Sequence, residues 1–319
     1  ISHLRMSNNL FYSDELKSFE KKFLNISFHP NLHLCSTGAL AVEAAIKCGY
    51  EYRKDLNSIV YSLKKSFHGI NSWGFTTDRN INSVRSRVAN YPKNNWKKFE
   101  LDELINRLEN ITEDVSSVII EPIQCTAGDI YLDINKLIKI QELCNKNDIC
   151  FIVDEIQTGF GVTGEMWYSQ MMGLNPDVIV FGKKSQICGI MVNDKFSEAI
   201  YSRYRKLEVT FDGDLIDAVR SEDVIKAIEN YSLLGNVKNN SEVFRSELSE
   251  MFENYRSIGH LIAFDFKKES ERDSFVKNAY TKRLLVNPTE ENSIRIRPNL
   301  ALSNNELDRL VTIFKQIKP

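Results

Sequence analysis

Residues 151–189 read FIVDEIQTGFGVTGEMWYSQMMGLNPDVIVFGKKSQICG, and each of the two apolar runs in this stretch leads to charged residues. Ile152 and Val153 are followed by Asp154, and the run at 178–181 leads through a glycine to Lys183. Short β-branched runs bounded by turn-forming residues are typical of buried strands. The stretch therefore predicts two buried strands that end in an acid and a base.

Strand-like and helix-like segments alternate around this stretch. A segment with apolar residues at helical spacing begins after Asp133, a residue type that favours the N-cap of a helix. Such alternation predicts an α/β fold with a mostly parallel sheet sandwiched by crossover helices. The strand candidates are residues 58–62, 115–120, 149–153 and 178–181.

The pattern of predicted strands and helices changes near residue 215. A long amphipathic and charged stretch, 215–255, precedes strand candidates at 259–266 and 293–298 and a terminal helical pattern at 303–318. These features indicate a smaller α+β domain with no linker before it. We therefore predict a large domain over residues 1–215 and a small C-terminal domain over residues 216–319.

Composition excludes several classes of function. The 319 residues carry 41 Lys+Arg against 43 Asp+Glu, so no global charge attracts nucleic acid or a membrane surface. Six cysteines without a C-x-x-C pair, and no signal-peptide or membrane-spanning pattern, predict reduced thiols and a cytoplasmic protein. Five dispersed histidines predict no metal site, and no P-loop motif G-x-x-x-x-G-K-[ST] occurs in the sequence.

The charged strand ends suit one kind of cofactor. A lysine at the carboxyl edge of a parallel sheet can form a Schiff base, and a carboxylate on a neighbouring strand end can keep a pyridine nitrogen protonated. Lys183 and Asp154 would supply both groups for pyridoxal 5'-phosphate. Gly38 and Ala39 open a helix whose N-terminus could bind the phosphate, and Phe67 could stack on the ring.

Each of these signals alone has an ordinary structural explanation as a turn, a surface group or a core residue. Together, the segments STGALAVEAAIK, SFHG, IIEPIQ, VDEIQTGFGVTG, PDVIVFGKK, VTFDGD and IRIRP follow one another in the order typical of a known family. The chain resembles the class III (omega) aminotransferases, which are fold-type I pyridoxal-phosphate enzymes. DVIVFGKKSQICGIM and GALAVE are most similar to the L-lysine 6-aminotransferase branch.

The resemblance assigns cofactor contacts residue by residue. It implies that Lys183 forms the Schiff base and shuttles the proton, whereas Lys184 is a bystander. It implies that Asp154 pairs with the pyridine nitrogen. We also expect Lys183 to be desolvated, because burial favours the uncharged amine. The other implied contacts are Gln157 to the 3-hydroxyl, Gly38 and Ala39 to the phosphate, Phe67 stacked on the ring and His68 beside it.

The resemblance also implies partners and substrate contacts. Thr210 matches a threonine that reaches the phosphate of a neighbouring subunit, which implies a homodimer with shared active sites. Arg295 matches a carboxylate-binding arginine. Glu121 would be a structural residue near the site. The implied substrates are a small-molecule amine or amino acid and 2-oxoglutarate, which would react in ping-pong order.

The sequence departs from the family pattern at several points. Ile70 replaces an arginine of the lysine branch, and Thr126 replaces an acidic residue that can mask Arg295. Asp212 and Asp214 bring carboxylates towards the predicted phosphate end, where negative charge is unfavourable. Only 35 residues precede STGALAVEAA, whereas family members carry a longer N-terminal segment, so we expect truncation, incomplete representation or divergence.

These departures leave three hypotheses open. The leading one is transamination of a terminal primary amine, with lysine as the favoured donor. An aminomutase or epimerase would keep Lys183 and Asp154 without needing a carboxylate switch. A catalytically impaired homologue that acts as a partner subunit would leave the protein colourless with the cofactor. Amine-dependent formation of glutamate from 2-oxoglutarate would separate the first hypothesis from the second.

Overall fold

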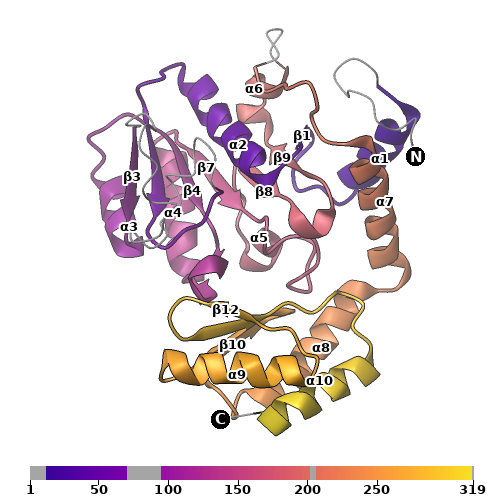
Figure 1. The fold of residues 1–319 in the computed structure, drawn as a ribbon. Helices are drawn as coiled ribbons and strands as arrows, with labels where there is room; N and C mark the ends of the chain where they lie inside the picture. The colour runs from indigo at the N-terminus through magenta and orange to yellow at the C-terminus, as the bar shows by residue number, and fades with distance from the viewer. Residues whose placement is uncertain (1–11, 70–94, 202–205, 318–319) are drawn as a thin grey trace. The chain divides into compact units, whose positions relative to one another are not determined.

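The computed structural model describes residues 12–69, 95–201 and 206–317, and its contacts divide the chain into two compact units (Figure 1). The first unit comprises Ile1–Pro122, Leu132–Gly159 and Trp167–Lys226. The second comprises Ile123–Tyr131, Phe160–Met166 and Ala227–Pro319. Two short segments that lie in the sequence between parts of the first unit thus belong to the second unit.

A seven-stranded sheet forms the centre of the first unit, in the order β1-β9-β8-β7-β4-β2-β3. The pairs β2–β3, β2–β4, β4–β7 and β7–β8 are parallel, whereas β9 runs antiparallel to both β8 and β1. The strands are β1 (Asn31–Cys35), β2 (Ile59–Leu63), β3 (Trp96–Phe99), β4 (Val115–Ile120), β7 (Cys150–Asp154), β8 (Val178–Phe181) and β9 (Cys188–Val192).

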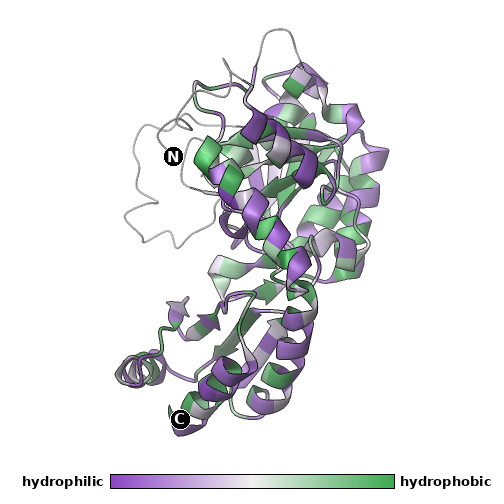
Figure 2. Cartoon of the chain, turned by 90° about the vertical axis from the view of Figure 1, so that its right-hand side faces the viewer, coloured by the Kyte–Doolittle hydropathy of each residue, from purple (hydrophilic) through white to green (hydrophobic). Residues whose placement is uncertain are grey.

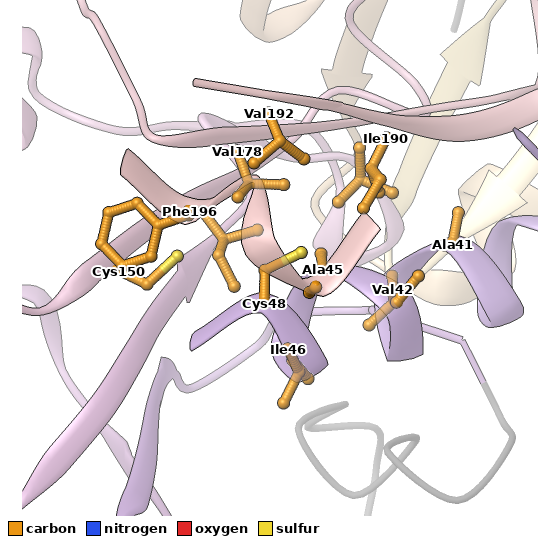
Figure 3. Packing of buried hydrophobic residues seen from close by; sticks show 14 of the residues in the cluster. Ala41, Val42, Ala45, Ile46, Cys48, Cys150, Val178, Ile190, Val192 and Phe196 are labelled. Atoms are coloured by element: carbon orange, nitrogen blue, oxygen red, sulfur yellow. The ribbon is translucent and has the colours of Figure 1, made fainter. Parts of the chain in front are cut away.

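Helices cover this sheet because its central strands are apolar on both sides. All five residues of β7 are buried, which requires packing on both faces. Helix α2 contacts β1, β4, β7, β8 and β9, and its alanines let it lie close to them, as Figure 3 shows for Ala41 and Ala45. The helices of this unit are α1 (Asp14–Leu24), α2 (Gly38–Arg53), α3 (Leu101–Glu109), α4 (Ile134–Lys146), α5 (Tyr168–Met172) and α6 (Glu198–Tyr201), and α7 (Leu215–Asn230) begins in it.

The helix starts follow local capping chemistry. Thr37 is extended and its Oγ1 accepts a hydrogen bond from Leu40 N at 3.2 Å, which caps α2. Asp133 caps α4 by accepting from Asn135 N and Lys136 N at 2.8 and 3.2 Å, as the sequence predicted. The four strands predicted between residues 58 and 181 and the α/β fold class are likewise confirmed, with end points that differ by one residue in β2 and β7.

The parallel strands bring several turns to one edge of the sheet. Strands β1, β2, β4, β7 and β8 run in the same direction, because β1 and β8 both pair antiparallel with β9. Their carboxyl ends therefore lie along a common edge. Segments that follow these ends form the binding crevice in open parallel sheets.

The second unit is an antiparallel sheet covered by helices. Its strands lie in the order β10-β11-β13-β12 and are β10 (Glu253–Ile258), β11 (Leu261–Asp265), β12 (Asn287–Thr289) and β13 (Ser293–Ile296). Its core includes Phe244, Phe252, Phe264, Phe275 and Phe314. Figure 2 shows hydrophilic and hydrophobic residues side by side along its helices, as expected for helices with one buried face. These are α8 (Leu233–Leu248), α9 (Glu269–Thr281) and α10 (Asn304–Ile317).

Two details of the second unit differ from the sequence patterns. The stretch 215–255 is interrupted where Ser232 adopts a left-handed conformation (φ 50°), and it ends within β10. A small hairpin, β5 (Ile123–Gln124) and β6 (Ile130–Tyr131), packs with this unit although its sequence lies among the strands of the first. Within the described ranges, no helix combines the length and the apolar character that crossing a membrane requires.

Candidate active site

A cavity of about 250 Å³ lies at the carboxyl edge of the parallel strands in the first unit. Every turn that follows β1, β2, β4, β7 and β8 contributes to it. Seven of the predicted site residues line it, all but Thr210, Arg295 and Thr126. The lining residues are Gly38, Ala39, Phe67, His68, Gly69, Glu121, Asp154, Ile156, Gln157, Lys183 and Cys188.

Asp154 is the buried acid of the cavity. It ends β7 with 4% of its surface exposed, and its Oδ2 lies 2.9 Å from His68 Nδ1. Its Oδ1 accepts a hydrogen bond from Ile156 N at 3.1 Å. Because both oxygens are engaged, the orientation of the carboxylate is fixed before any ligand binds. His68 thus contacts Asp154 directly, a relation that spacing along the chain could not predict.

Glu121 orients the aromatic wall of the cavity. It follows β4 and is 5% exposed, and its Oε1 accepts a hydrogen bond from Phe67 N at 2.6 Å. A carboxylate that binds a backbone N–H forms a charge-assisted hydrogen bond, which is stronger than a neutral one. Glu121 therefore fixes the turn that carries Phe67 and His68.

The N-terminus of α2 supplies an anion-binding wall. The first turn of a helix leaves backbone N–H groups without helical partners. At α2 these include Gly38 and Ala39, both of which line the cavity, and the first turn contains no acidic residue that would compensate the helix dipole. A Cβ on Gly38 would lie 2.9 Å from Ile156 Cδ1, so glycine keeps this wall open.

Lys183 follows β8 and reaches the cavity in a strained backbone conformation. Its φ is 54°, in the left-handed region that non-glycine residues seldom adopt, and it begins the 3-10 turn η5 (Lys183–Ser185). The side chain is exposed in the single chain. The reason is its place in a turn at the mouth of the cavity, beyond the buried end of β8.

The turn after β7 has a second buried carboxylate. Glu155 is 1% exposed and accepts hydrogen bonds from Tyr168 N, Ser169 N and Thr158 Oγ1 at 2.6, 2.8 and 3.3 Å. Burial raises its pKa, and the bonds from Ser169, Tyr168 and Thr158 oppose this rise. No role for Glu155 was predicted from the sequence. Its position beside Asp154 was the only available signal.

Three residues that line the cavity were not predicted. Ile156 lies between Asp154 and Gln157, and Cys188 begins β9 at the same edge of the sheet. Gly69 has φ 97°, and a Cβ there would lie 3.0 Å from Ala39 Cβ. Residue type alone could not distinguish these small or apolar residues from ordinary core residues. Ile70, which follows them in the sequence, lies outside the described residues.

The segment 209–214 lies beside the start of α2. Ser36 Oγ donates a hydrogen bond to Phe211 O, and Thr210 is exposed. Asp212 accepts from Val209 N at 3.0 Å, and Asp214 accepts from Ile216 N at 2.7 Å at the start of α7. Burial raises the pKa of Asp212 to about 6. These two carboxylates therefore hold local backbone turns.

Arg295 and Thr126 lie in the second unit. Arg295 Nη1 donates a hydrogen bond to Cys125 O at 2.7 Å, so the guanidinium lies at the turn that contains Thr126. Thr289 Oγ1 donates to Thr126 O at 2.7 Å. The structure thus brings together the two residues predicted to contact substrate.

The same hairpin is held by two further arginines. Arg256 Nε donates to the carbonyls of Gly128 and Asp129 at 2.9 and 3.0 Å. Arg297 Nη2 lies 2.5 Å from the carboxylate of Asp129, which is fully buried. The hairpin that carries Thr126 is therefore an integral part of the second unit.

Comparison with known proteins identifies relatives along almost the whole chain. Residues 1–317 match the family model for aminotransferase class-III. An L-lysine-epsilon aminotransferase of Amycolatopsis lactamdurans is 30% identical over 88% of this chain and 71% of its own length. An acetylornithine aminotransferase of Archaeoglobus fulgidus is 28% identical over 96% of this chain and 80% of its own length. A solved structure of the lysine aminotransferase from M. tuberculosis superposes with a TM-score of 0.90 at 25% identity, covering 99% of this chain and 82% of that one.

Proposed function

This chain belongs to the class III aminotransferases, and from that premise we propose that it transfers the terminal amino group of a lysine-like primary amine to 2-oxoglutarate. Enzymes of this family depend on pyridoxal 5'-phosphate and catalyse amine transamination. The observation that carries the proposal is the convergence of Lys183, Asp154 and the N-terminus of α2 on one cavity.

The donor set of the cavity fits pyridoxal 5'-phosphate. An amine, a buried carboxylate and a helix N-terminus correspond to the aldehyde, the ring nitrogen and the phosphate of that molecule. Phe67 provides an aromatic face for the ring, and Gln157 a polar group for its hydroxyl. The cavity therefore has one group of suitable chemistry for each part of the cofactor.

Each residue of the cavity would have its own role in the reaction. When bound, the cofactor supplies an aldehyde for a lysine amine and a cationic ring that accepts electrons. Asp154, held by His68 and by Ile156 N, would keep a proton on the ring nitrogen. Nζ of Lys183 would take the proton from the substrate carbon that bears nitrogen and would deliver it to the carbon that the cofactor's aldehyde supplies. The N–H groups of Gly38 and Ala39 would hold the phosphate.

The proposed donor and acceptor rest on the relatives and on Arg295. Relatives named as lysine and acetylornithine aminotransferases both support a donor with a terminal primary amine. Arg295 would bind a substrate carboxylate, as guanidinium groups do through paired hydrogen bonds. Thr126 carries no charge that could mask Arg295. Donor and acceptor would bind in turn, which gives ping-pong kinetics.

We further propose that two copies share their active sites. The exposed Thr210 would reach the phosphate bound by the partner, and the exposed side chain of Phe211 beside it offers apolar surface for such a contact. A mixture of two inactive variants, Lys183→Ala and Thr210→Ala, should regain part of the activity if sites are shared.

The decisive test is covalent trapping of the cofactor. Wild-type protein should become coloured with pyridoxal phosphate, and borohydride reduction should attach the cofactor to Lys183. Lys183→Ala should lose this adduct, whereas the matched control Lys184→Ala should keep it. Loss of the adduct only in Lys184→Ala would show that the wrong lysine was chosen.

A panel of amine donors should then identify the substrate. Glutamate formation from 2-oxoglutarate that depends on lysine or a similar amine would support the proposal. Racemisation or migration of an amino group without glutamate would instead identify an epimerase or aminomutase. A colourless protein in both assays would identify a catalytically impaired homologue.

A further inference from the structure

The buried carboxylate of Glu155 accepts hydrogen bonds from residues on both sides of a segment, 160–166, that leaves the first unit. Thr158 precedes residues 160–166, which belong to the second unit, and Tyr168 and Ser169 follow them. The chain therefore leaves the first unit and returns to it within reach of one carboxylate. Glu155 lies outside the cavity lining, so no ligand contact explains it.

A short series of contacts joins Glu155 to the cavity. Its N–H donates to Val180 O at 2.9 Å, which extends the pairing of β7 with β8, and its carbonyl accepts from Gly159 N at 2.9 Å. The turn closed in this way contains Ile156, whose N–H binds Asp154 Oδ1. The orientation of the Asp154 carboxylate therefore depends on a turn that Glu155 holds from behind.

Tight packing restricts the same turn further. A Cβ on Gly159 would lie 2.8 Å from two ring carbons of Trp167 and 3.0 Å from the carbonyl of Glu155. The indole N–H of Trp167 donates to Ile26 O at 2.6 Å, which holds the ring in place. The turn thus has little space in which to adopt another conformation if the carboxylate is changed.

We propose that Glu155 is a positioning residue for the cofactor, which sets the orientation of Asp154 and Gln157. Its carboxylate accepts from the hydroxyl of Thr158 before residues 160–166 and from backbone N–H groups after them. This inference rests on the proposed role of Asp154 at the ring nitrogen. A carboxylate suits the position because its two oxygens accept from two N–H groups and a hydroxyl together. An amide would turn an N–H group towards one of these donors.

Asp177 provides a matched control. It is also a buried carboxylate, 6% exposed, and accepts hydrogen bonds from Phe151 N and Asn193 Nδ2 at 2.9 and 2.6 Å. It precedes β8, at the amino end of the strand, whereas the cavity lies at the carboxyl end. Asp177→Asn should therefore reduce stability without a direct effect on cofactor binding.

The test compares Glu155→Gln with Asp177→Asn in the holoenzyme. We expect Glu155→Gln to weaken the affinity for pyridoxal phosphate by about ten-fold or more, and to change the absorption spectrum of the bound cofactor. Asp177→Asn should lower the thermal midpoint but leave affinity and spectrum unchanged. Equal affinity and an identical spectrum in the two folded variants would overturn the inference.

Thr158→Val and the wild-type adduct provide two further tests of the positioning role. If Glu155→Gln does not fold, Thr158→Val removes one donor and should weaken cofactor affinity by about three-fold, and an unchanged affinity in that variant would overturn the inference. If wild-type protein forms no reducible adduct at Lys183, the proposed function fails and this inference fails with it. An intact wild-type adduct with an unaffected Glu155→Gln variant refutes only the positioning role.

Discussion

Replacing Gly49 by alanine should destabilise the first unit, although alanine is the better helix former. Gly49 lies in α2, where it faces β4. A Cβ at this position would lie 1.9 Å from Ser117 Oγ, 2.9 Å from Ser116 O and 3.3 Å from Cys150 Cβ. The hydroxyl of Ser117 can rotate, but the carbonyl of Ser116 belongs to the backbone of a central strand and cannot move without disturbing the sheet.

The magnitude follows from two opposing effects. Overpacking of a well-packed core costs about 1–3 kcal/mol, and contact with a fixed backbone atom places this case at about 3 kcal/mol or above. Alanine in place of glycine within a helix contributes about 1 kcal/mol in the opposite direction. The net loss should be about 2 kcal/mol or more, which corresponds to a thermal midpoint lower by about 4–8 °C in a unit of this size.

Circular dichroism during thermal unfolding would measure the effect, with Gly235→Ala as a control. Gly235 lies in α8 and a Cβ there meets no atom within 4 Å, so the same substitution should be neutral or stabilising by up to about 1 kcal/mol. Adding Ser117→Ala to Gly49→Ala should recover part of the loss. A Gly49→Ala protein as stable as wild type would refute the close approach of α2 to β4.

Three other perturbations test particular groups. Burial raises the pKa of Asp212 to about 6, so the protonated carboxyl favours folding; this contribution is present below about pH 4 and is lost as the pH rises through 6. Denaturant titrations should therefore show that the free energy of unfolding of Asp212→Asn, relative to that of wild type, increases from pH 4 to pH 7.5. Asp129→Ala leaves Arg297 without its buried carboxylate and should cost about 3–5 kcal/mol in unfolding of the second unit; a loss below 1 kcal/mol would contradict the buried pair. Arg295→Ala should raise the KM for 2-oxoglutarate by about ten-fold or more with a smaller change in kcat, and an unchanged KM would remove Arg295 from the proposed carboxylate site.

The sequence predicted most of the polar residues that line the cavity because they follow strand ends. Apolar runs locate strands, parallel strands place their carboxyl ends on one edge, and the residues that follow then meet. Asp154 and Lys183 could be paired in this way without any knowledge of their distance. The same reasoning could not find the contact between His68 and Asp154, because it depends on how the turn after β2 folds back over the sheet.

The exposure of Lys183 could not be predicted either. Its neighbours in the sequence are the buried residues of β8, which suggested a buried side chain. The structure instead turns the chain at Lys183 through a left-handed residue, and no glycine or asparagine there signalled such a conformation. Local composition reports the average environment of a segment, whereas the exposure of Lys183 depends on where the chain turns after β8.

The division of the chain into units shows a further limit of sequence patterns. Residues 123–131 follow a strand of the first unit, but carbonyls at Cys125, Thr126, Gly128 and Asp129 accept hydrogen bonds from side chains more than 100 residues later. No periodicity marks such a segment, because its partners are backbone acceptors and distant donors. The roles of the arginines at 256, 295 and 297 can be interpreted only when the three are considered together. Arg295 matches a carboxylate-binding arginine, while Arg256 and Arg297 hold the hairpin beside which Arg295 lies. If Arg295 binds the substrate carboxylate as proposed, a substitution in this hairpin should change the KM for 2-oxoglutarate, even where the substituted residue itself contacts no substrate.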